Sequence, residues 1–159
     1  MPTAYLNIGS NIGDRRSYLE RAVACISHRW GDVRVSTPYE SEPWGFDSPN
    51  LFLNIGVSLT VDECESPLGF LGEIQDIERS ISPASHRTEE GEYADRMVDI
   101  DIIAIDGMIM SERTLELPHP RMHLREFVLY PMMEIAPDWV HPVLKMTCSQ
   151  MLDAIHNKT

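Results

Sequence analysis

Hydrophobic and polar residues follow two different spacings along this chain. Residues 3–9 (TAYLNIG) and 51–60 (LFLNIGVSLT) read as strands, in which successive side chains point to opposite faces. In the second strand one face carries Phe52 and Asn54, and the other carries Leu51, Leu53, Ile55 and Val57. Asn54 is a poor strand former between apolar neighbours, which favours a functional role for it.

Helical spacing is present in three other stretches. Residues 15–30 carry one apolar stripe at i, i+4, i+7 and i+11, and Asp14 is placed to cap the start of this helix. The stripe consists of Leu19, Val23, Ile26 and Trp30. A second helix is predicted over 66–80, where Leu68, Leu71, Ile74 and Ile77 or Glu78 mark its faces, and a third over 147–156.

The remaining segments complete the expected order of elements. Residues 33–41 predict a strand in which Pro38 marks an edge or an irregularity. Residues 96–105 predict a buried strand, and Asp106-Gly107 predicts a hairpin turn to a short strand at 108–110. Residues 81–96 are polar and without periodicity, and we expect a loop of this length in a domain to be mobile or functional.

The order strand-helix-strand-strand-helix-strand predicts an α+β ferredoxin-like sandwich. Its sheet is expected to be mostly antiparallel, with the helices packed on one face and the substrate site on the other side. A chain of 159 residues with no linker or repeat fits a single domain over 1–159.

Two acids one residue apart stand out on the predicted strand 96–105. Asp99 and Asp101 project from the same face, roughly 6–7 Å apart at ~3.3 Å of rise per residue. Such a pair can hold one or two hard cations such as Mg²⁺, which are usually shared with phosphates. The alternative is two acids on a solvated sheet face, which repel each other and lose hydration without any return.

The composition of the chain limits the kinds of partner that the protein is expected to bind. A net charge of −12 argues against nucleic acid, whose binding depends on a cationic face. No apolar run approaches the ~20 residues of a membrane span, and no obligate protein partner is evident. Three widely spaced cysteines favour free thiols in a reducing cytoplasm. Eleven Arg against two Lys suit a small phosphate ligand, because arginine grips phosphate oxygens in pairs.

The acidic pair has neighbours that suit phosphoryl transfer. Arg96 lies three residues before it, the long polar loop precedes it, and His119 follows in LPHPRMHLREF. Metal ions and cations neutralise the charge that develops in such a reaction. The chain has no GxxxxGK[ST] phosphate loop and no kinase catalytic-loop pattern, which excludes the common nucleotide folds.

Six ordered segments resemble the 6-hydroxymethyl-7,8-dihydropterin pyrophosphokinase family. They are YLNIGSNIGD (5–14), YESEPWGFDSPNLFLNIGVSL (39–59), IQDIE (74–78), DRMVDIDII (95–103), LPHPRM (117–122) and REFVLYPMMEIAP (125–137). The resemblance implies transfer of the β,γ-diphosphate of ATP to the hydroxymethyl group of a reduced pterin, in folate biosynthesis, with release of AMP.

The resemblance also implies residue roles. Asp99 and Asp101 would ligate two Mg²⁺ ions, and with Arg87 and Arg96 they would form the catalytic group. The ATP side would further include Gln75, Glu78, Ile102, His119 and Arg125. The pterin would lie between Phe52 and Phe127, and its other neighbours would be Ser41, Glu42, Pro43, Trp44, Asn54 and Tyr93. Two aromatic faces hold a flat heterocycle well, and an Asn can offer both donor and acceptor to its edge.

Other interpretations stay open from the residues alone. Phe52 and Phe127 could be core aromatics, His119 a turn histidine, and Asn54 a partner of a neighbouring loop. Residues 79–96 also depart from the family, many of whose members carry Gly-Arg-x-Arg and Gly-Pro-Arg runs there, so Arg87 and Tyr93 are the best stand-ins. The alternative functions are a metal-dependent phosphohydrolase and a non-catalytic ligand-binding module on the same fold.

Overall fold

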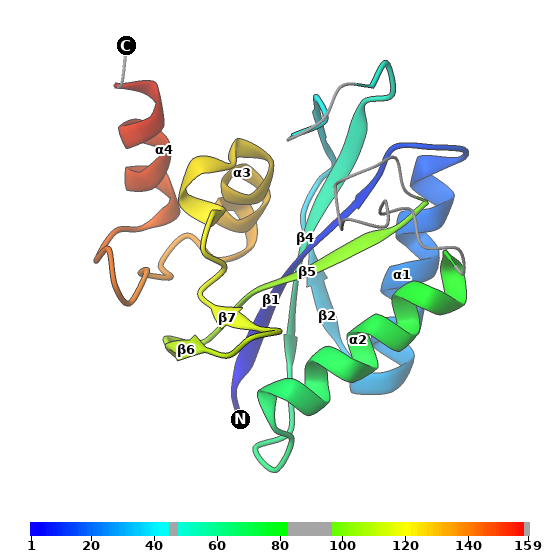
Figure 1. Cartoon of the computed structure of the whole chain (residues 1–159), viewed down its shortest axis with the longest axis horizontal. Helices are drawn as coiled ribbons and strands as arrows, with labels where there is room; N and C mark the ends of the chain where they lie inside the picture. Colours follow the sequence, from blue (N-terminus) through cyan, green and yellow to red (C-terminus); the bar gives the residue numbers. More distant parts are fainter. Residues whose placement is uncertain (45–47, 83–96, 158–159) are drawn as a thin grey trace.

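An antiparallel sheet forms the middle layer of the molecule (Figure 1), in a computed structural model that describes residues 1–44, 48–82 and 97–157. Its strands are β1 (Thr3–Ser10), β2 (Val33–Val35), β3 (Tyr39–Ser41), β4 (Phe52–Thr60) and β5 (Asp99–Ile105). The order is β2-β4-β1-β5, with β3 also paired to β4, and every pairing is antiparallel. The predicted strand over 33–41 is thus two strands, which Pro38 separates.

Helices α1 (Arg15–Trp30) and α2 (Pro67–Ile81) pack on one face of this sheet, as predicted (Figure 1). Asp14 caps α1 by accepting a hydrogen bond from the Ser17 N–H at 3.1 Å, and Ser66 caps α2 in the same way. On α2 the buried residues are Phe70, Ile74 and Ile81, whereas Leu68 is 45% exposed. The core on this face includes Ile8, Ile26, Val57, Phe70 and Ile74.

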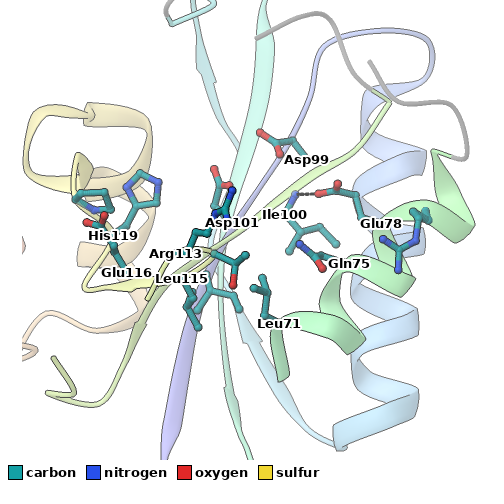
Figure 2. Close-up of a pocket in the computed structure, with 14 residues that line it drawn as sticks. Leu71, Gln75, Glu78, Asp99, Ile100, Asp101, Arg113, Leu115, Glu116 and His119 are labelled. Atoms are coloured by element: carbon teal, nitrogen blue, oxygen red, sulfur yellow. Dashed lines mark hydrogen bonds between the residues drawn. The ribbon is translucent and has the colours of Figure 1, made fainter. Parts of the chain in front are cut away.

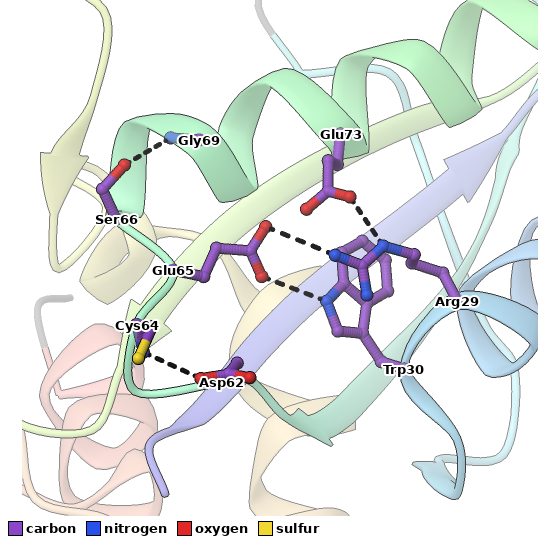
Figure 3. A network of polar contacts seen from close by, with 8 residues as sticks. All are labelled: Arg29, Trp30, Asp62, Cys64, Glu65, Ser66, Gly69 and Glu73. Carbon is purple, nitrogen blue, oxygen red and sulfur yellow. Dashed lines mark hydrogen bonds and ion pairs between the residues drawn. The ribbon is translucent and has the colours of Figure 1, made fainter.

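A polar network joins the end of α1 to the start of α2 (Figure 3). The Arg29 Nε lies 2.6 Å from the Glu73 carboxylate, and the Trp30 indole N–H donates to Glu65 at 3.3 Å. The Trp30 ring meets Phe70 edge-on, with 5.1 Å between ring centroids. Because the ion pair is partly exposed, it contributes little beyond ~1 kcal/mol, and the aromatic contact holds the two helices together.

Two further helices cover part of the opposite face of the sheet. They are α3 (Glu126–Ile135) and α4 (Cys148–His156), and the second of these was predicted at 147–156. The first was missed because Pro131 stands inside it, where proline usually breaks a helix. Gly56 of β4 permits the close approach of α3, since a Cβ there would lie 3.1 Å from the Pro131 backbone. The face expected to be free for ligand is therefore only partly open.

The edge strand β5 carries a bulge that changes which residues face the helices. Tyr5 pairs with Ala104 and Leu6 with Ile102, so Ile103 is an extra residue without a partner in β1. The Ile103 carbonyl instead accepts a hydrogen bond from the His119 N–H at 2.8 Å. The bulge therefore attaches the segment that carries His119 to the strand that carries the acidic pair.

The predicted hairpin after β5 is wrong in its pairing. Asp106 and Gly107 do form a turn, but β6 (Met110–Ser111) pairs with β7 (Glu116–Leu117) and not with β5. Asp106 is bonded to the start of β1 instead: its carboxylate accepts from the Thr3 N–H and its own N–H donates to the Thr3 carbonyl. A short 3-10 helix (Met122–Leu124) precedes α3. In the part of the chain that the structure describes, no helix has the length and the apolar sequence needed to cross a membrane.

Candidate active site

Two rows of residues cross the open face of the sheet. In the first row Asp99 of β5 pairs with Gly9 of β1, which pairs with Asn54 of β4. In the second row Asp101 pairs with Asn7. Directly opposed residues of an antiparallel sheet project to the same face, about 4.5–5.5 Å apart between Cβ atoms. The strand registers therefore place both acids and Asn54 on one face, which is the arrangement that the predicted site needs.

Gly9 leaves space in the middle of the first row. A Cβ built at this position would lie 3.1 Å from the Asn54 Oδ1 and 3.2 Å from the Phe52 Cδ1. Any side chain here would push both away. Because Gly9 has no side chain, the surface of the sheet is flat between the acidic strand and the Phe52 ring; this surface is the floor of the site.

A cavity of about 690 Å³ surrounds the acidic pair at the edge of the sheet (Figure 2). Figure 2 shows Asp99 and Asp101 on β5, with the Gln75 and Glu78 side chains of α2 on one side and Glu116 and His119 on the other. The remaining lining residues are Leu71, Arg79, Ile100, Ile102, Arg113, Thr114, Leu115 and Pro120. The volume suits a ligand as large as a nucleotide.

The charges of this cavity are mixed, with acids in excess. Its lining holds four carboxylates and two guanidinium groups, from Glu78, Asp99, Asp101, Glu116, Arg79 and Arg113. A triphosphate entering it needs additional positive charge, and hard divalent cations supply that charge when two carboxylates share them with phosphates. Within residues 1–44, 48–82 and 97–157, no group of three or more acidic, His or Cys side chains forms a metal cage. The donor set fits a cation that arrives with phosphate oxygens.

Glu78 fixes α2 to the acidic strand. Its carboxylate accepts a hydrogen bond of 2.8 Å from the Ile100 N–H, between the two aspartates (Figure 2). Because β5 is at the edge of the sheet, this N–H faces away from β1 and has no strand partner there. Glu78 thus holds the backbone of the acidic pair while it lines the cavity.

His119 is neutral near pH 7 in the ligand-free protein. Burial, followed by the charges of Arg125 and Arg121, lowers its pKa to about 4, although Glu116 opposes the shift. The Nδ1 atom accepts a hydrogen bond from the Arg121 N–H at 3.2 Å, so the Nε2 atom carries the ring proton. His119 can therefore donate a hydrogen bond to an anion as a neutral side chain.

Arg125 is buried between two aromatic rings. Its guanidinium carbon lies 4.3 Å from the Trp44 ring centroid and 5.6 Å from that of Phe127. Arg121 approaches the outer part of the same Trp44 at 5.7 Å. Arg125 is not part of the lining of the large cavity, but its charge lowers the pKa of His119, which is. Cation–π contact holds these side chains together.

Asn54 contacts the protein through its donors. Its Nδ2 donates to the Tyr39 carbonyl at 2.9 Å and to the Ser41 Oγ at 2.8 Å. The amide therefore anchors β3 to β4, which was the alternative interpretation from sequence. With both hydrogens engaged, the group that Asn54 can offer to a ligand is its Oδ1 acceptor, and not donor and acceptor together.

The predicted residues thus fall into two neighbouring groups. Gln75, Glu78, Ile102 and His119 line one cavity with Asp99 and Asp101. Phe127, Trp44 and Arg125 gather at the start of α3, and Ser41 lies with Asn54 and Phe52 on the adjoining strands. Glu42 and Pro43 directly follow β3. Arg87, Tyr93 and Arg96 lie outside the described residues, as does most of the loop 81–96.

Sequence reasoning missed four polar residues of the cavity, which are Arg79 of α2 and three residues near β7. Arg113, Thr114 and Glu116 line it from the β6–β7 hairpin. The polar run 111–114 between two short strands was the available indication, but only the folded chain brings it opposite β5. Arg113 matters most, because it supplies positive charge beside the two aspartates.

Known proteins that are similar to this chain point to one family. Residues 5–137 match the family model described as 7,8-dihydro-6-hydroxymethylpterin-pyrophosphokinase. A 2-amino-4-hydroxy-6-hydroxymethyldihydropteridine pyrophosphokinase of Porphyromonas gingivalis is 41% identical over 145 residues, which are 89% of this chain and 95% of the relative. The protein of the same name from Aquifex aeolicus is 34% identical, over 91% of this chain and 87% of the relative.

Solved structures agree on the fold. The crystal structure of wild-type Plasmodium falciparum HPPK-DHPS with SDX-DHP aligns with 96% of this chain at a TM-score of 0.74 and 14% identity. The chain spans 44% of that longer protein. At this identity the comparison speaks for the fold alone, and it confirms the predicted ferredoxin-like α+β architecture.

Proposed function

The chain belongs to the 7,8-dihydro-6-hydroxymethylpterin-pyrophosphokinase family, and from this premise we propose how its residues divide the reaction. The family transfers the β,γ-diphosphate of ATP to the hydroxymethyl group of 6-hydroxymethyl-7,8-dihydropterin, giving AMP and the pterin diphosphate. The predicted recognition and activity are confirmed. The relatives give no support to a phosphohydrolase or a non-catalytic binding module.

One observation carries the division: the strand registers put an acidic row and an aromatic site on the same face. Asp99 and Asp101 open onto the large cavity, which would receive the triphosphate. Gly9 leaves the adjoining floor flat, and Phe52 and Asn54 border it. The pterin would lie there, with Phe127 on its other side. Two substrates bound in these places would meet above β1.

The residues of the chain act mainly by positioning and by charge. Neutral His119 donates from its Nε2 to a phosphate oxygen, and Arg113 neutralises part of the triphosphate charge. Phe52 and Phe127 hold the pterin so that its hydroxyl faces the β-phosphorus, which converts an encounter of two molecules into one oriented step. Arg87, Arg96 and Tyr93 remain predictions for this site, because they lie outside the described residues.

Mg²⁺ fits the donor set at the acidic pair, and the proposal assigns two ions to Asp99 and Asp101. Two carboxylates on a rigid strand, in a cavity with excess negative charge, match ions that complete their shell with phosphate oxygens. When bound, such ions supply charge neutralisation and a template for the phosphates. A cytoplasmic location, a single domain over 1–159 and the lack of a protein partner stay predictions from the sequence.

The test is release of AMP from ATP, measured with and without added 6-hydroxymethyl-7,8-dihydropterin and with and without Mg²⁺. We expect AMP only when both are present, together with one pterin diphosphate for each AMP. Phosphate release without pterin would indicate hydrolysis, and binding of both ligands without AMP would indicate a non-catalytic module. Either outcome would overturn the proposal.

A further inference from the structure

Asn7 is a buried polar residue at the centre of the middle strand. It is 4% exposed and lies between Leu6 and Ile8, which belong to the core on the other face of β1. A buried amide costs free energy unless it is hydrogen-bonded. Its Nδ2 atom donates to the Phe127 carbonyl at 2.9 Å, across a gap of 120 residues in the sequence. This bond links the sheet to the start of α3.

The carbonyl that Asn7 binds lacks its usual donor within the helix. In an α-helix the carbonyl of residue i accepts from the N–H of residue i+4. Four residues after Phe127 stands Pro131, which has no N–H. Asn7 therefore supplies from the sheet the hydrogen bond that the helix cannot make for itself.

The register places this bond at the meeting point of the two substrate sites. Asn7 pairs with Gly56 on one side, where Pro131 rests against β4, and with Asp101 on the other. Asp101 and Asn7 project to the same face as direct neighbours, about 4.5–5.5 Å apart between Cβ atoms. Asn7 thus adjoins the acidic pair and also holds the backbone of the aromatic residue proposed for the pterin.

We propose that Asn7 is a positioning residue that fixes Phe127, and with it the pterin ring, at a set height above Asp101. The proposal rests on the role of Phe127 given under the proposed function. Phe127 follows Arg125 at the first turn of α3, so a shift of this turn moves the stacking ring directly. Loss of the bond should therefore weaken pterin binding and orientation, and leave the nucleotide cavity on the other side of β5 nearly unchanged.

The chain offers a matched control at the other end of the same helix. The Arg34 Nη1 of β2 donates to the Ile135 carbonyl at 3.2 Å, so it also ties a sheet strand to an α3 carbonyl. Asn7→Thr keeps a strand-forming polar residue that is too short to reach Phe127. Arg34→Met removes the second bond and keeps the long side chain. Both variants loosen α3, but only the first acts next to Phe127.

The experiment is steady-state kinetics, in which each substrate is varied at saturating concentrations of the other, together with thermal unfolding of each variant. We expect Asn7→Thr to raise the KM for the pterin about five- to tenfold and to lower kcat, while the KM for ATP stays within twofold. Arg34→Met should leave both KM values within twofold, although its Tm falls. An unchanged pterin KM in Asn7→Thr, or an equal rise in Arg34→Met, would overturn the positioning role.

A double variant separates positioning from simple repair of the helix. Pro131→Ala restores an N–H to which the Phe127 carbonyl can bond, but it does not reconnect α3 to β1. In Asn7→Thr/Pro131→Ala the KM for the pterin should therefore stay raised, relative to Pro131→Ala alone. If the KM for the pterin in the double variant equals that of Pro131→Ala alone, Asn7 serves only to stabilise the helix, and the inference fails.

Two further arrangements keep the test decisive. If Asn7→Thr does not fold, Asn7→Leu replaces it, because leucine has the same number and branching of side-chain heavy atoms as asparagine and cannot donate. Its Kd for the pterin, measured by calorimetry with a non-hydrolysable ATP analogue and Mg²⁺, should show the same selective loss. Wild-type protein serves as the reference: if it makes no AMP with pterin, the proposed function fails, whereas an active wild type with unaffected Asn7 variants overturns the inference about Asn7 alone.

Discussion

The two faces of the sheet follow different rules. On the face covered by α1 and α2, the inward residues are apolar from end to end, as at Ile8, Val57 and Ile100. On the opposite face, the same strands carry Asn7, Asn54 and the two aspartates, and α3 and α4 cover only part of it. The face under α1 and α2 is core throughout, whereas the opposite face combines the polar residues of the site with a second apolar core beneath α3 and α4.

Substitutions on the two faces should therefore affect different properties of the protein, stability on one face and catalysis or binding on the other. Burial of apolar surface stabilises the folded state by about 25 cal/mol per Å², so a substitution on the helix-covered face should lower the free energy of unfolding. Polar residues of the open face are held by specific partners, such as Glu78 at the Ile100 N–H and Asn54 at Ser41. Substitutions there should act on catalysis and binding more than on folding.

Asp101→Asn should nearly abolish transfer while the fold stays intact. Loss of a carboxylate from a metal-binding pair costs several kcal/mol of transition-state stabilisation, and about 4 kcal/mol corresponds to roughly a thousandfold in kcat/KM. Its Tm should stay close to that of the wild type, because asparagine has the size of aspartate and opens no cavity. The control is Ile8→Val on the opposite face, which should lose about 0.5–1.5 kcal/mol of unfolding free energy and keep its kcat. Near-normal turnover in folded Asp101→Asn would contradict the assignment.

His119 should make the protein less stable as the pH falls from about 6.5 to 4. Its pKa is lowered in the folded protein, so the unfolded chain binds the proton more readily over this range, and acid favours unfolding. The contribution is fully present above pH 6.5 and amounts to at most about 3 kcal/mol, at 1.36 kcal/mol per pKa unit.

Denaturant unfolding of His119→Gln at pH 7 and pH 4.5 measures this. The variant should lose less unfolding free energy between the two values than the wild type. Some dependence should remain, because burial also lowers the pKa of His141. Equal losses in the two proteins would show that His119 is not held in its neutral form.

Gly56→Ala should destabilise the protein by about 1–3 kcal/mol, since its Cβ would meet the Pro131 backbone at 3.1 Å and force α3 away from β4. The same shift should raise the KM for the pterin. Gly72→Ala in α2 is the matched control, because nothing lies within 4 Å of its new Cβ. A helix interior gains about 0.5–1 kcal/mol from this change. If thermal unfolding showed the same direction for both variants, the close contact would not matter.

Phe127→Ala should weaken pterin binding about tenfold and leave ATP binding almost unchanged. Aromatic stacking contributes ~0.5–1.5 kcal/mol beyond burial of area, and the large cavity does not include Phe127. Phe70→Leu, an aromatic substitution on the other face, should lower the Tm without altering pterin affinity. Calorimetry with each ligand tests both, and an equal fall in ATP and pterin affinity for Phe127→Ala would mark it as a core residue.

Much of the fold could be predicted because its determinants are local. Alternation along 51–60 follows from backbone geometry, and the caps at Asp14 and Ser66 depend on side chains three residues from their partners. Helix α3 was missed for the converse reason. A proline in a helix is tolerated there only because Gly56 lets it approach the sheet and Asn7 supplies the missing donor, and both lie far away in the sequence.

The candidate site divides in the same way. The sequence was sufficient to predict that Asp99 and Asp101 share a face, because side chains alternate along a strand without any tertiary contact. It was also sufficient to show that segments typical of the pyrophosphokinase family occur in the family's order, because this depends only on residue identity. Three features could be seen only in the folded chain. Strand β1 joins the acids to Asn54, Arg113 faces the acids, and His119 is neutral. Register, proximity and burial arise from contacts between distant segments, and the pKa of a histidine responds to that burial and to its charged neighbours.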